Sequence, residues 1–233
     1  MDRVEIIRTI ASFKKAKTYL EIGVNDGFTF LKIPVWKKIG VDPSFRLRKR
    51  TILKNLVKNP SNLTNHYYKL TSDDFFCSKA DRLFKKKIDV AFIDGLHTFE
   101  QSLKDAENTL AYLDEKGVII MHDCCPPDEA SAYPAKSLDQ VKKSKPKGWT
   151  GDWCGDVWKT IPYLRALHKD LNVFVLNCDY GVGIITKGIP EKKLEISRQQ
   201  VMNMSYSDLE NNKELLLNLK EPDYLFDFLK SLK

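Results

Sequence analysis

Apolar positions along this chain follow two alternating patterns. Short runs of β-branched and other apolar residues predict buried strands, and longer stretches with a helical repeat of apolar positions lie between most of them. The predicted strands are Thr18–Ile22, Ile39–Val41, Tyr67–Leu70, Ile88–Ile93, Val118–Met121, Val173–Leu176 and Val182–Thr186. The predicted helices are an amphipathic N-terminal segment and roughly residues 44–58, 73–85, 99–114 and 156–169.

Alternation of strands and helices predicts a parallel sheet that is covered by helices on both faces. The last two strands are separated by "NCDYG", which is too short for a helical crossover, so they are expected to form an antiparallel hairpin. The predicted fold class is therefore α/β, a three-layer sandwich with a mostly parallel seven-stranded sheet that ends in this hairpin.

Two segments lie outside the predicted sheet. The loop 124–155 is rich in Pro, Lys, Gly and Trp, and a loop of this length inside a domain is usually functional or disordered. The tail after Pro190 shows helical patterns near residues 206–218 and 222–232, which could dock on the domain or on another subunit of a homo-oligomer. We expect one domain over residues 1–189 and a C-terminal helical extension over residues 190–233.

Composition narrows the class of protein. No run approaches the roughly 18 apolar residues of a membrane span, and the N-terminus lacks the pattern of a signal peptide. The five cysteines are odd in number and form no CxxC pair, which fits a reducing cytosol, so a cytoplasmic protein is expected. The formal net charge of +7 is compatible with a polyanionic partner such as nucleic acid, but the lysines are scattered over helices and loops, which favours a plain solvated surface.

Polar residues gather where the predicted strands end, which is where open α/β sheets bind ligands. In "YLEIGVNDG", Glu21 lies near a strand end, and Gly23 and Gly27 flank a tight turn that either brings backbone N–H groups to a ligand or serves only the chain reversal. Asp42, in "IGVDPS", can accept hydrogen bonds from both hydroxyls of a ribose or can act as a helix cap.

The third strand end is followed by "TSDD", in which Ser72 and Asp73 either reach an adenine edge or cap the next helix. The polar residues at these three strand ends follow one another along the chain in an order that resembles class I S-adenosylmethionine (SAM)-dependent methyltransferases. This resemblance implies a Rossmann-like fold. The "E-x-G-x-x-x-G" turn resembles the first motif of that superfamily, with Asn25 where a glycine is commonest, and Asp42 resembles its ribose-binding acid.

The resemblance covers about residues 17–187 and implies SAM as the cofactor. The residues expected to bind it are Glu21, Gly23, Asn25, Gly27, Asp42, Ser72 and Asp73. The stretches "FIDGLHTFEQSLKDAENTL", "GVIIMHDCCPP" and "GDVWKTI" are similar to a bacterial group that is related to metal-assisted, macrocin-type O-methyltransferases.

Asp94 and Asp123 follow two strands that are expected to be neighbours. Two carboxylates at one edge repel each other unless a cation or a proton separates them, and hard oxygen ligands suit Mg²⁺. The similar metal-dependent enzymes hold such an ion at the matching positions. Cys124 stands where catechol-type relatives have an asparagine, so His122 is the candidate third ligand, although imidazole favours a softer metal.

His97 precedes a possible capping box formed by Thr98 and Gln101. The positive end of the helix dipole disfavours the imidazolium form, and a neutral imidazole suits a general base. A histidine three residues after the first metal acid resembles the base of the macrocin-like enzymes, which implies a catalytic role for His97 beside Asp94. The alternative is a histidine bonded to a loop carbonyl. Asp156 either caps the following helix or contacts the acceptor or metal.

The leading hypothesis is O-methylation of a hydroxyl on a small molecule or sugar, with metal assistance and a histidine base. Tyr133, Trp149 and Trp153 in the loop 124–155 could stack on such an acceptor. The alternatives are an RNA or protein methyltransferase, suggested only by the charge, a non-catalytic SAM- or nucleotide-binding module, and more distantly a hydroxylase of the same fold. The prolines of "CCPP" follow the fifth strand instead of the fourth, which weakens the case for methylation of nucleic-acid bases.

Overall fold

Two of the predicted strands form with the expected bounds. In the computed structural model of the protein, which describes residues 1–85 and 87–232, β1 spans Thr18–Ile22 and β4 spans Ile88–Ile93. They pair in parallel, with Leu20 opposite Ala91. Lys86, and Lys233 at the end of the expected C-terminal extension, lie outside the described residues.

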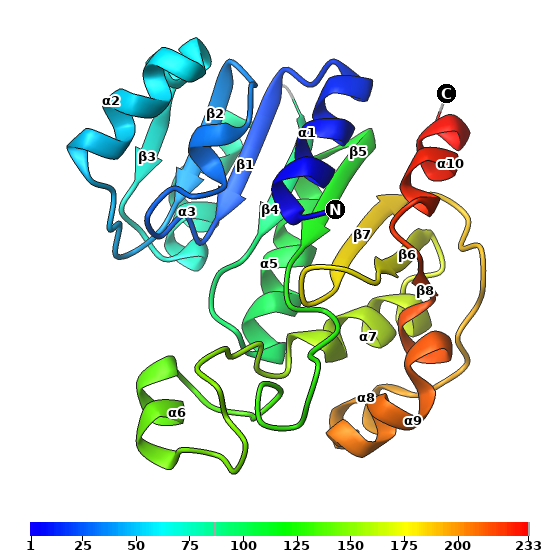
Figure 1. Cartoon of the computed structure of the whole chain (residues 1–233). Helices are drawn as coiled ribbons and strands as arrows, with labels where there is room; N and C mark the ends of the chain where they lie inside the picture. Colours follow the sequence, from blue (N-terminus) through cyan, green and yellow to red (C-terminus); the bar gives the residue numbers. More distant parts are fainter. Residues whose placement is uncertain (86, 233) are drawn as a thin grey trace. The chain divides into compact units, whose positions relative to one another are not determined.

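The chain divides into two units that alternate along the sequence (Figure 1). The first unit contains Met1–Gly95, Asp105–Ile120 and the described residues from Leu229 onward, and the second contains Leu96–Lys104 and Met121–Phe228. The domain boundary predicted between residues 189 and 190 stays a prediction.

The strands of the first unit are ordered β3-β2-β1-β4-β5. The three further strands are β2 (Lys37–Val41), β3 (His66–Tyr68) and β5 (Leu113–Met121). The pairs β1–β2, β2–β3 and β1–β4 are all parallel. The carboxyl ends of parallel strands meet at one edge, so the residues that follow β1, β2 and β4 are brought together there.

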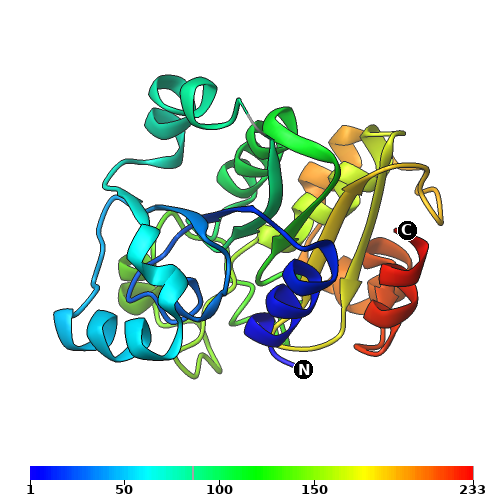
Figure 2. The same cartoon turned by 90° about the horizontal axis from the view of Figure 1, so that it is seen from above.

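Helices of the first unit surround these strands. They are α1 (Arg3–Lys14), α2 (Lys49–Lys58), α3 (Ser72–Ser78), α4 (Ala80–Leu83) and α5 (Phe99–Tyr112), together with the short 3₁₀ helices η1 (Phe30–Lys32) and η2 (Pro60–Thr64). Of these, α1 and α3 bury apolar side chains, whereas α2 buries none. Figure 2 shows α1 on one side of the first strands and α3 and α4 on the other.

Two of these helices differ from the prediction. The helix predicted from residue 44 begins only at Lys49, and the one predicted over 73–85 is interrupted at Lys79. A stacked pair of rings, Phe76 in α3 and Tyr112 in α5, packs with centroids 6.0 Å apart.

The second unit contains the predicted antiparallel hairpin. It consists of β6 (Leu171–Leu176) and β7 (Val182–Lys187), with Phe174 opposite Ile184. A two-residue strand that was not predicted, β8 (Leu219–Lys220), pairs in parallel with β6, so the order here is β7-β6-β8. The predicted α/β class with mostly parallel strands and a terminal hairpin is confirmed, and the strand count is corrected from seven to eight.

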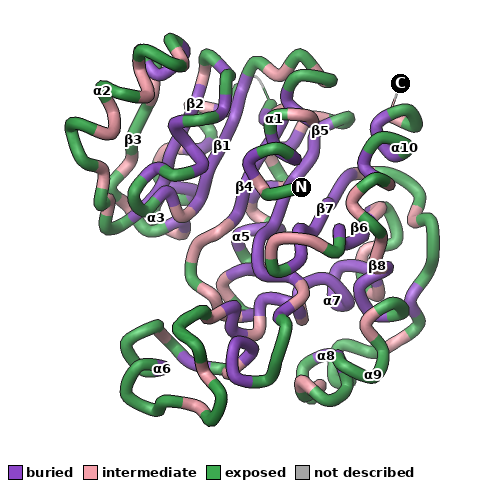
Figure 3. The backbone as a smooth tube through the Cα atoms, viewed as in Figure 1, coloured by how far each residue is buried: buried purple, intermediate pink, exposed green. Residues whose placement is uncertain are grey.

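The helices of the second unit hold its C-terminal segments against α7 (Thr160–Leu167). The others are α6 (Leu138–Ser144), η3 (Val157–Lys159), α8 (Arg198–Asn203) and α9 (Tyr206–Leu217). The last helix, α10 (Tyr224–Ser231), begins in this unit, and its residues from Leu229 onward belong to the first. Arg165 in α7 donates to the carbonyls of Leu215, Leu216 and Lys192, and Figure 3 shows α7 as largely buried. No helix among the described residues is long and apolar enough to cross a membrane.

Candidate active site

Gly23 lies where the ends of β1 and β4 approach each other most closely. Its φ is +87°, and a Cβ atom built there would come within 1.9 Å of the Asp94 carbonyl oxygen. The Asp94 N–H also donates to the carbonyl of Ile22 at 2.9 Å. Only glycine fits this position, which supports the alternative that Gly23 serves the chain reversal after β1. The same close approach places Asp94 directly beside the turn.

Asn25 adopts a left-handed conformation with φ +48°. Asparagine tolerates this region better than most residues, so it can take the place of the glycine that is commonest in similar turns. Its backbone N–H donates to Oδ2 of Asp42 at 2.7 Å, and the N–H of Ser44 donates to Oδ1 of the same carboxylate at 2.6 Å. Asp42 therefore joins the turn after β1 to the segment after β2, and it does not cap α2.

Gly27 closes the same turn with φ +80°, and its N–H donates to the carbonyl of Val24. A Cβ atom there would lie 2.4 Å from Cδ2 of Leu47, a side chain in the segment that leads to α2. The Arg46 N–H donates to the carbonyl of Asn25, which fixes that segment against the turn. The late start of α2 follows from these contacts, because residues 44–48 are engaged with the turn.

Glu21 points into the protein interior. It is 1% exposed and accepts a hydrogen bond from the hydroxyl of Tyr19 at 2.5 Å. Burial, together with the nearby Asp94 carboxylate, raises the pKa of Glu21 to about 8. Burial also lowers the pKa of Lys38 to about 7. A role for Glu21 in binding the cofactor stays a prediction.

Ser72 and Asp73 lie at the start of α3, but neither acts as its cap. The cap is Thr71, whose hydroxyl oxygen accepts from the N–H of Asp74 at 3.1 Å. Ser72 is buried and Asp73 is half-buried. Thr71 therefore caps α3 in place of Ser72 or Asp73. Contact of Ser72 and Asp73 with a cofactor stays a prediction.

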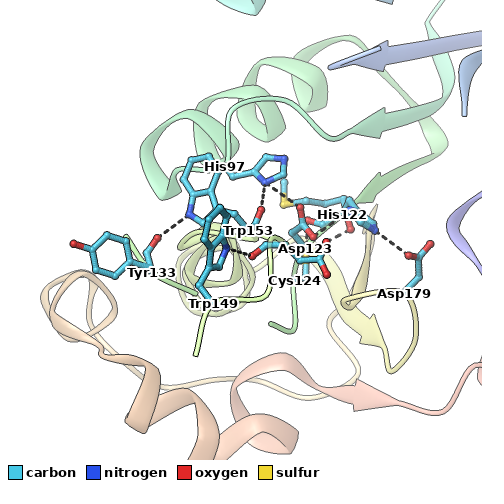
Figure 4. A network of polar contacts seen from close by, with 10 residues as sticks. His97, His122, Asp123, Cys124, Tyr133, Trp149, Trp153 and Asp179 are labelled. Atoms are coloured by element: carbon cyan, nitrogen blue, oxygen red, sulfur yellow. Dashed lines mark hydrogen bonds and ion pairs between the residues drawn. The ribbon is translucent and has the colours of Figure 1, made fainter. Parts of the chain in front are cut away.

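His97 belongs to the second unit, where the segment before α5 meets the loop 124–155. Its Nδ1 lies 2.6 Å from the carbonyl oxygen of Trp153 and 3.2 Å from Oδ2 of Asp123. The imidazole also stacks on the Trp153 ring, with centroids 5.3 Å apart (Figure 4). The loop-carbonyl bond that was weighed as an alternative to catalysis is therefore present, and it fixes the orientation of the ring.

Asp123 lies at the centre of a polar network (Figure 4). It has φ +60°, which is strained for a residue with a side chain. Its Oδ1 lies 3.2 Å from Nδ1 of His122, while Nε2 of His122 lies 3.4 Å from Asp179. The buried thiol of Cys154 donates to the same carboxylate, and burial and this carboxylate together raise the pKa of Cys154 far above its usual value. Because both ring nitrogens of His122 face carboxylates, these contacts do not support its predicted role as a metal ligand.

Asp179 and Tyr180 were missed at the sequence level. They form the β6–β7 turn with Gly181, and all three residues have positive φ values. The N–H groups of Cys124 and Cys125 donate to the carbonyls of Gly181 and Tyr180, so the turn packs against the segment that carries Asp123. The only sequence signal was the acid in the short "NCDYG" connection, which reads as ordinary turn chemistry.

Asp156 does not cap the helix that follows it, and its contact with an acceptor or metal stays a prediction. As the residue before η3 it makes no capping bond to its own helix. Its Oδ1 instead accepts from the N–H of Phe99 at 2.7 Å, the first residue of α5. Thr98 adds the predicted contact to the Gln101 N–H, at 3.4 Å. The start of α5, and with it the position of His97, therefore depends on a carboxylate that is distant in sequence.

The aromatic residues of the loop 124–155 are tied to the loop backbone. The Trp153 indole donates to the carbonyl of Tyr133 at 2.8 Å, and the Trp149 indole donates to the carbonyl of Asp152 at 2.7 Å. The loop also contains α6. Contact of these three rings with an acceptor stays a prediction.

Comparison with known proteins gives a consistent picture. Residues 20–124 match the family model of a methyltransferase domain. A Staphylococcus aureus protein provisionally assigned as a caffeoyl-CoA O-methyltransferase superposes with a TM-score of 0.55 at 19% identity, covering 81% of this chain and 85% of that one. The sequence matches no curated protein.

Two further structures were solved with ligands. The O-methyltransferase from Bacillus cereus, in complex with S-adenosylhomocysteine, has a TM-score of 0.54 at 11% identity and covers 79% of this chain and 80% of that one. TomG, the O-methyltransferase of tomaymycin synthesis from Streptomyces achromogenes, was solved in complex with SAM. It has a TM-score of 0.54 at 11% identity, and the match covers 80% of this chain and 79% of that one. At these identities the likeness establishes a shared fold.

Proposed function

We propose that this chain transfers the methyl group of SAM to a hydroxyl oxygen of a small molecule or sugar. Its fold resembles that of solved O-methyltransferases, and its residues 20–124 match the family model of a methyltransferase domain, which supports this proposal. The observation that carries the choice of a hydroxyl acceptor is the imidazole of His97, which is held through Nδ1 by the Trp153 carbonyl at 2.6 Å. A base oriented in this way suits an acceptor that must lose a proton.

The proposed base is Nε2 of His97. A carbonyl oxygen only accepts, so the proton in the contact with Trp153 is on Nδ1, and Nε2 is the basic atom of the neutral ring. Asp123, 3.2 Å from Nδ1, would stabilise the charge that the ring gains when it takes the proton. The acceptor oxygen would then form its bond to the methyl carbon while the bond from that carbon to the sulfonium sulfur breaks.

The proposed SAM-binding residues lie in the first unit. Each oxygen of Asp42 accepts one backbone N–H and retains a lone pair for a ribose hydroxyl, which is the donor chemistry that the cofactor requires. The turn of Gly23, Asn25 and Gly27 would contact the rest of the cofactor through its backbone. Glu21, Ser72 and Asp73 are proposed as additional contacts.

A divalent cation is proposed at Asp94 and Asp123, with Mg²⁺ as the leading candidate because both ligands are hard carboxylates. Asp94 precedes His97 by three residues, and this length of chain spans at most about 10 Å, which keeps Asp94 close to the proposed base. When bound, the cation would lower the pKa of the acceptor hydroxyl and hold it in position. His122 is better suited to orienting Asp123 than to binding the metal itself.

The proposed acceptor is a small molecule or glycan that presents a hydroxyl, and the proposed compartment is the cytoplasm, since all five cysteines are free thiols. Two rival functions remain distinguishable. An RNA or protein methyltransferase would transfer label from SAM to a macromolecule instead of to a hydroxyl compound. A binding module would bind SAM stoichiometrically without turnover.

Titration calorimetry with SAM, with and without Mg²⁺, tests the central proposal. We expect wild type to bind one equivalent of SAM, and Asp42→Ala to lose at least about tenfold in affinity because a bidentate partner of the ribose is removed. Asp139→Ala, which removes an exposed acid in α6, is the matched control and should bind normally. Absence of SAM binding by wild type would refute the proposal.

His97→Ala is expected to retain SAM affinity and to lose about 10²–10⁴-fold in methyl transfer, as measured with radiolabelled SAM and a panel of hydroxylated acceptors. Added imidazole should restore part of the rate. If the variant turned over as fast as wild type at every pH of the profile, His97 would have no part in the mechanism.

A further inference from the structure

The helix α2 and its surroundings form an exposed surface that the proposed reaction does not use. We define the α2 surface by its exposed basic and apolar side chains, which are Arg46, Arg48, Lys49, Arg50, Lys54, Lys58, Trp36, Leu53, Val57 and Leu63. All belong to the first unit, and Figure 3 shows α2 as exposed along most of its length, with none of its residues buried.

The charge on this surface has a single sign. The segment from Pro43 to Asn65 contains six arginine and lysine residues and no aspartate or glutamate. Within residues 1–85 and 87–232, none of these six cations has an ion pair with an acid. A helix that only needs solubility carries both signs, so a one-signed helix indicates an anionic partner.

Apolar and basic side chains on α2 form two adjacent rows. Residues four positions apart lie one above the other on a helix, which aligns Leu53 with Val57 and aligns Arg50 with Lys54 and Lys58. Leu53 is 65% exposed and Val57 is 81% exposed. The inward face is formed by the half-buried Ile52 and Leu56. The outward apolar row is therefore additional to the half-buried side chains on the other face of the helix.

Two further exposed apolar side chains lie on η2, which is bonded to α2, and on the segment before β2, which is bonded to η2. Asn62 in η2 donates to the carbonyl of Asn55 in α2 at 3.2 Å, and the Thr64 hydroxyl donates to the carbonyl of Trp36. These bonds hold Leu63, which is 70% exposed, and Trp36, which is 61% exposed, on segments fixed to the helix. An exposed tryptophan with leucine and valine among basic residues is the composition of helices that lie in a membrane interface.

We propose that the α2 surface binds the surface of an anionic lipid bilayer. The basic row would contact lipid phosphates, and the apolar row with Trp36 and Leu63 would enter the boundary between headgroups and acyl chains. Such a helix lies on the membrane and does not cross it. The methyltransferase domain would thereby work at a bilayer and reach acceptors that are present there.

A nucleic acid is the other polyanion that the charge could attract. Its phosphates contact the cationic side chains of a protein, and its bases stack on aromatic side chains. Neither group contacts an exposed aliphatic pair such as Leu53 and Val57 favourably. The apolar row is thus what favours lipid over RNA, and the same row separates the two partners in an experiment.

Vesicle co-sedimentation of the full chain provides the test. The probes are phosphatidylcholine vesicles with and without about one third phosphatidylglycerol, at low and moderate salt. One variant removes the basic row, Arg50→Gln, Lys54→Gln and Lys58→Gln, and a second removes the apolar row, Leu53→Ser and Val57→Ser. The matched control removes three exposed lysines elsewhere, Lys142→Gln, Lys143→Gln and Lys145→Gln.

We expect wild type and the control to bind anionic vesicles and not neutral ones, and both α2 variants to lose at least about tenfold in vesicle affinity. Thermal unfolding and SAM calorimetry of all variants should match wild type, which separates this outcome from any failure of the proposed activity. Absence of wild-type binding to anionic vesicles, or an equal loss in the control, would overturn the proposal. So would binding to a homopolymeric RNA that persists when Leu53 and Val57 are replaced.

Discussion

At the scale of single residues, Glu21 shows how burial sets a pH dependence. Its pKa is raised from 4.5 to about 8, so between these values the native state holds a proton that the unfolded state has lost. The stability it contributes is fully present below pH 4.5 and is lost as the pH rises toward about 8. The pKa of Lys38 is lowered to about 7, so Lys38 affects the free energy of unfolding mainly above pH 7, where its contribution to stability rises with pH.

Glu21→Gln should therefore flatten this dependence, because glutamine resembles the protonated acid and does not titrate. We expect the free energy of unfolding of the variant, relative to wild type, to increase between about pH 5 and about pH 7. Urea unfolding at several pH values measures this difference. A difference that does not change with pH would mean that Glu21 is already ionised in the native protein.

Gly23→Ala is expected to destabilise the protein by at least about 3 kcal/mol, since the added Cβ atom meets both a positive φ and the Asp94 carbonyl. Gly148 is the matched control. It has a similar φ of +85° but nothing within 4 Å of the added atom, so Gly148→Ala should cost only the backbone strain. Equal losses in the two variants, by chemical denaturation, would argue against the close approach of β1 and β4.

At the scale of elements, the sequence predicted those strands whose bounds are set by a local run of apolar residues. The apolar runs of β1 and β4 have the expected bounds because both strands are buried along almost their whole length. The two-residue β8 and the short α8 could not be predicted, because β8 exists only through its pairing with β6 and α8 has a single buried residue, Val201. Tertiary contacts decide such elements, and they leave no periodic pattern.

The start of α5 is a second case, because its strongest cap comes from Asp156. Asp156→Ala should destabilise the protein by about 1 kcal/mol by leaving the N–H of Phe99 without an acceptor. Asp156→Asn keeps an acceptor oxygen and should cost less. Thermal unfolding of the two variants compares them, and equal, negligible effects would show that Thr98 alone is a sufficient cap.

At the scale of the whole molecule, the predicted site residues are distributed over both units of the chain. Asp42 and Asp94 belong to the first unit, while His97 and Asp123 belong to the second, although Asp94 and His97 are only three residues apart in the chain. The sequence predicted these residues because each follows a strand. It could not predict that both nitrogens of His122 face acids, because this depends on Asp179 in a distant turn.

The accessibility of the five thiols provides a test that involves the whole molecule. Cys77 is exposed, whereas Cys124 and Cys154 are buried, and burial raises the pKa of the Cys125 and Cys154 thiols. We expect a thiol reagent near neutral pH to label Cys77 first and to label Cys124 and Cys154 only on unfolding, as followed by mass spectrometry. Cys77→Ser should remove the fast phase, and early labelling of Cys154 would contradict its contact with Asp123.

The crowding at Gly23 has a consequence for how evolutionary records of this protein are interpreted. A position that admits no side chain will remain glycine in every descendant that keeps these two strand ends together, whether or not the descendant still binds a cofactor. Invariance there measures steric room and carries no information about catalysis. Neither Asp42 nor His97 has the positive φ that favours glycine, so under the proposed function their replacement would mark a lineage that has abandoned the chemistry.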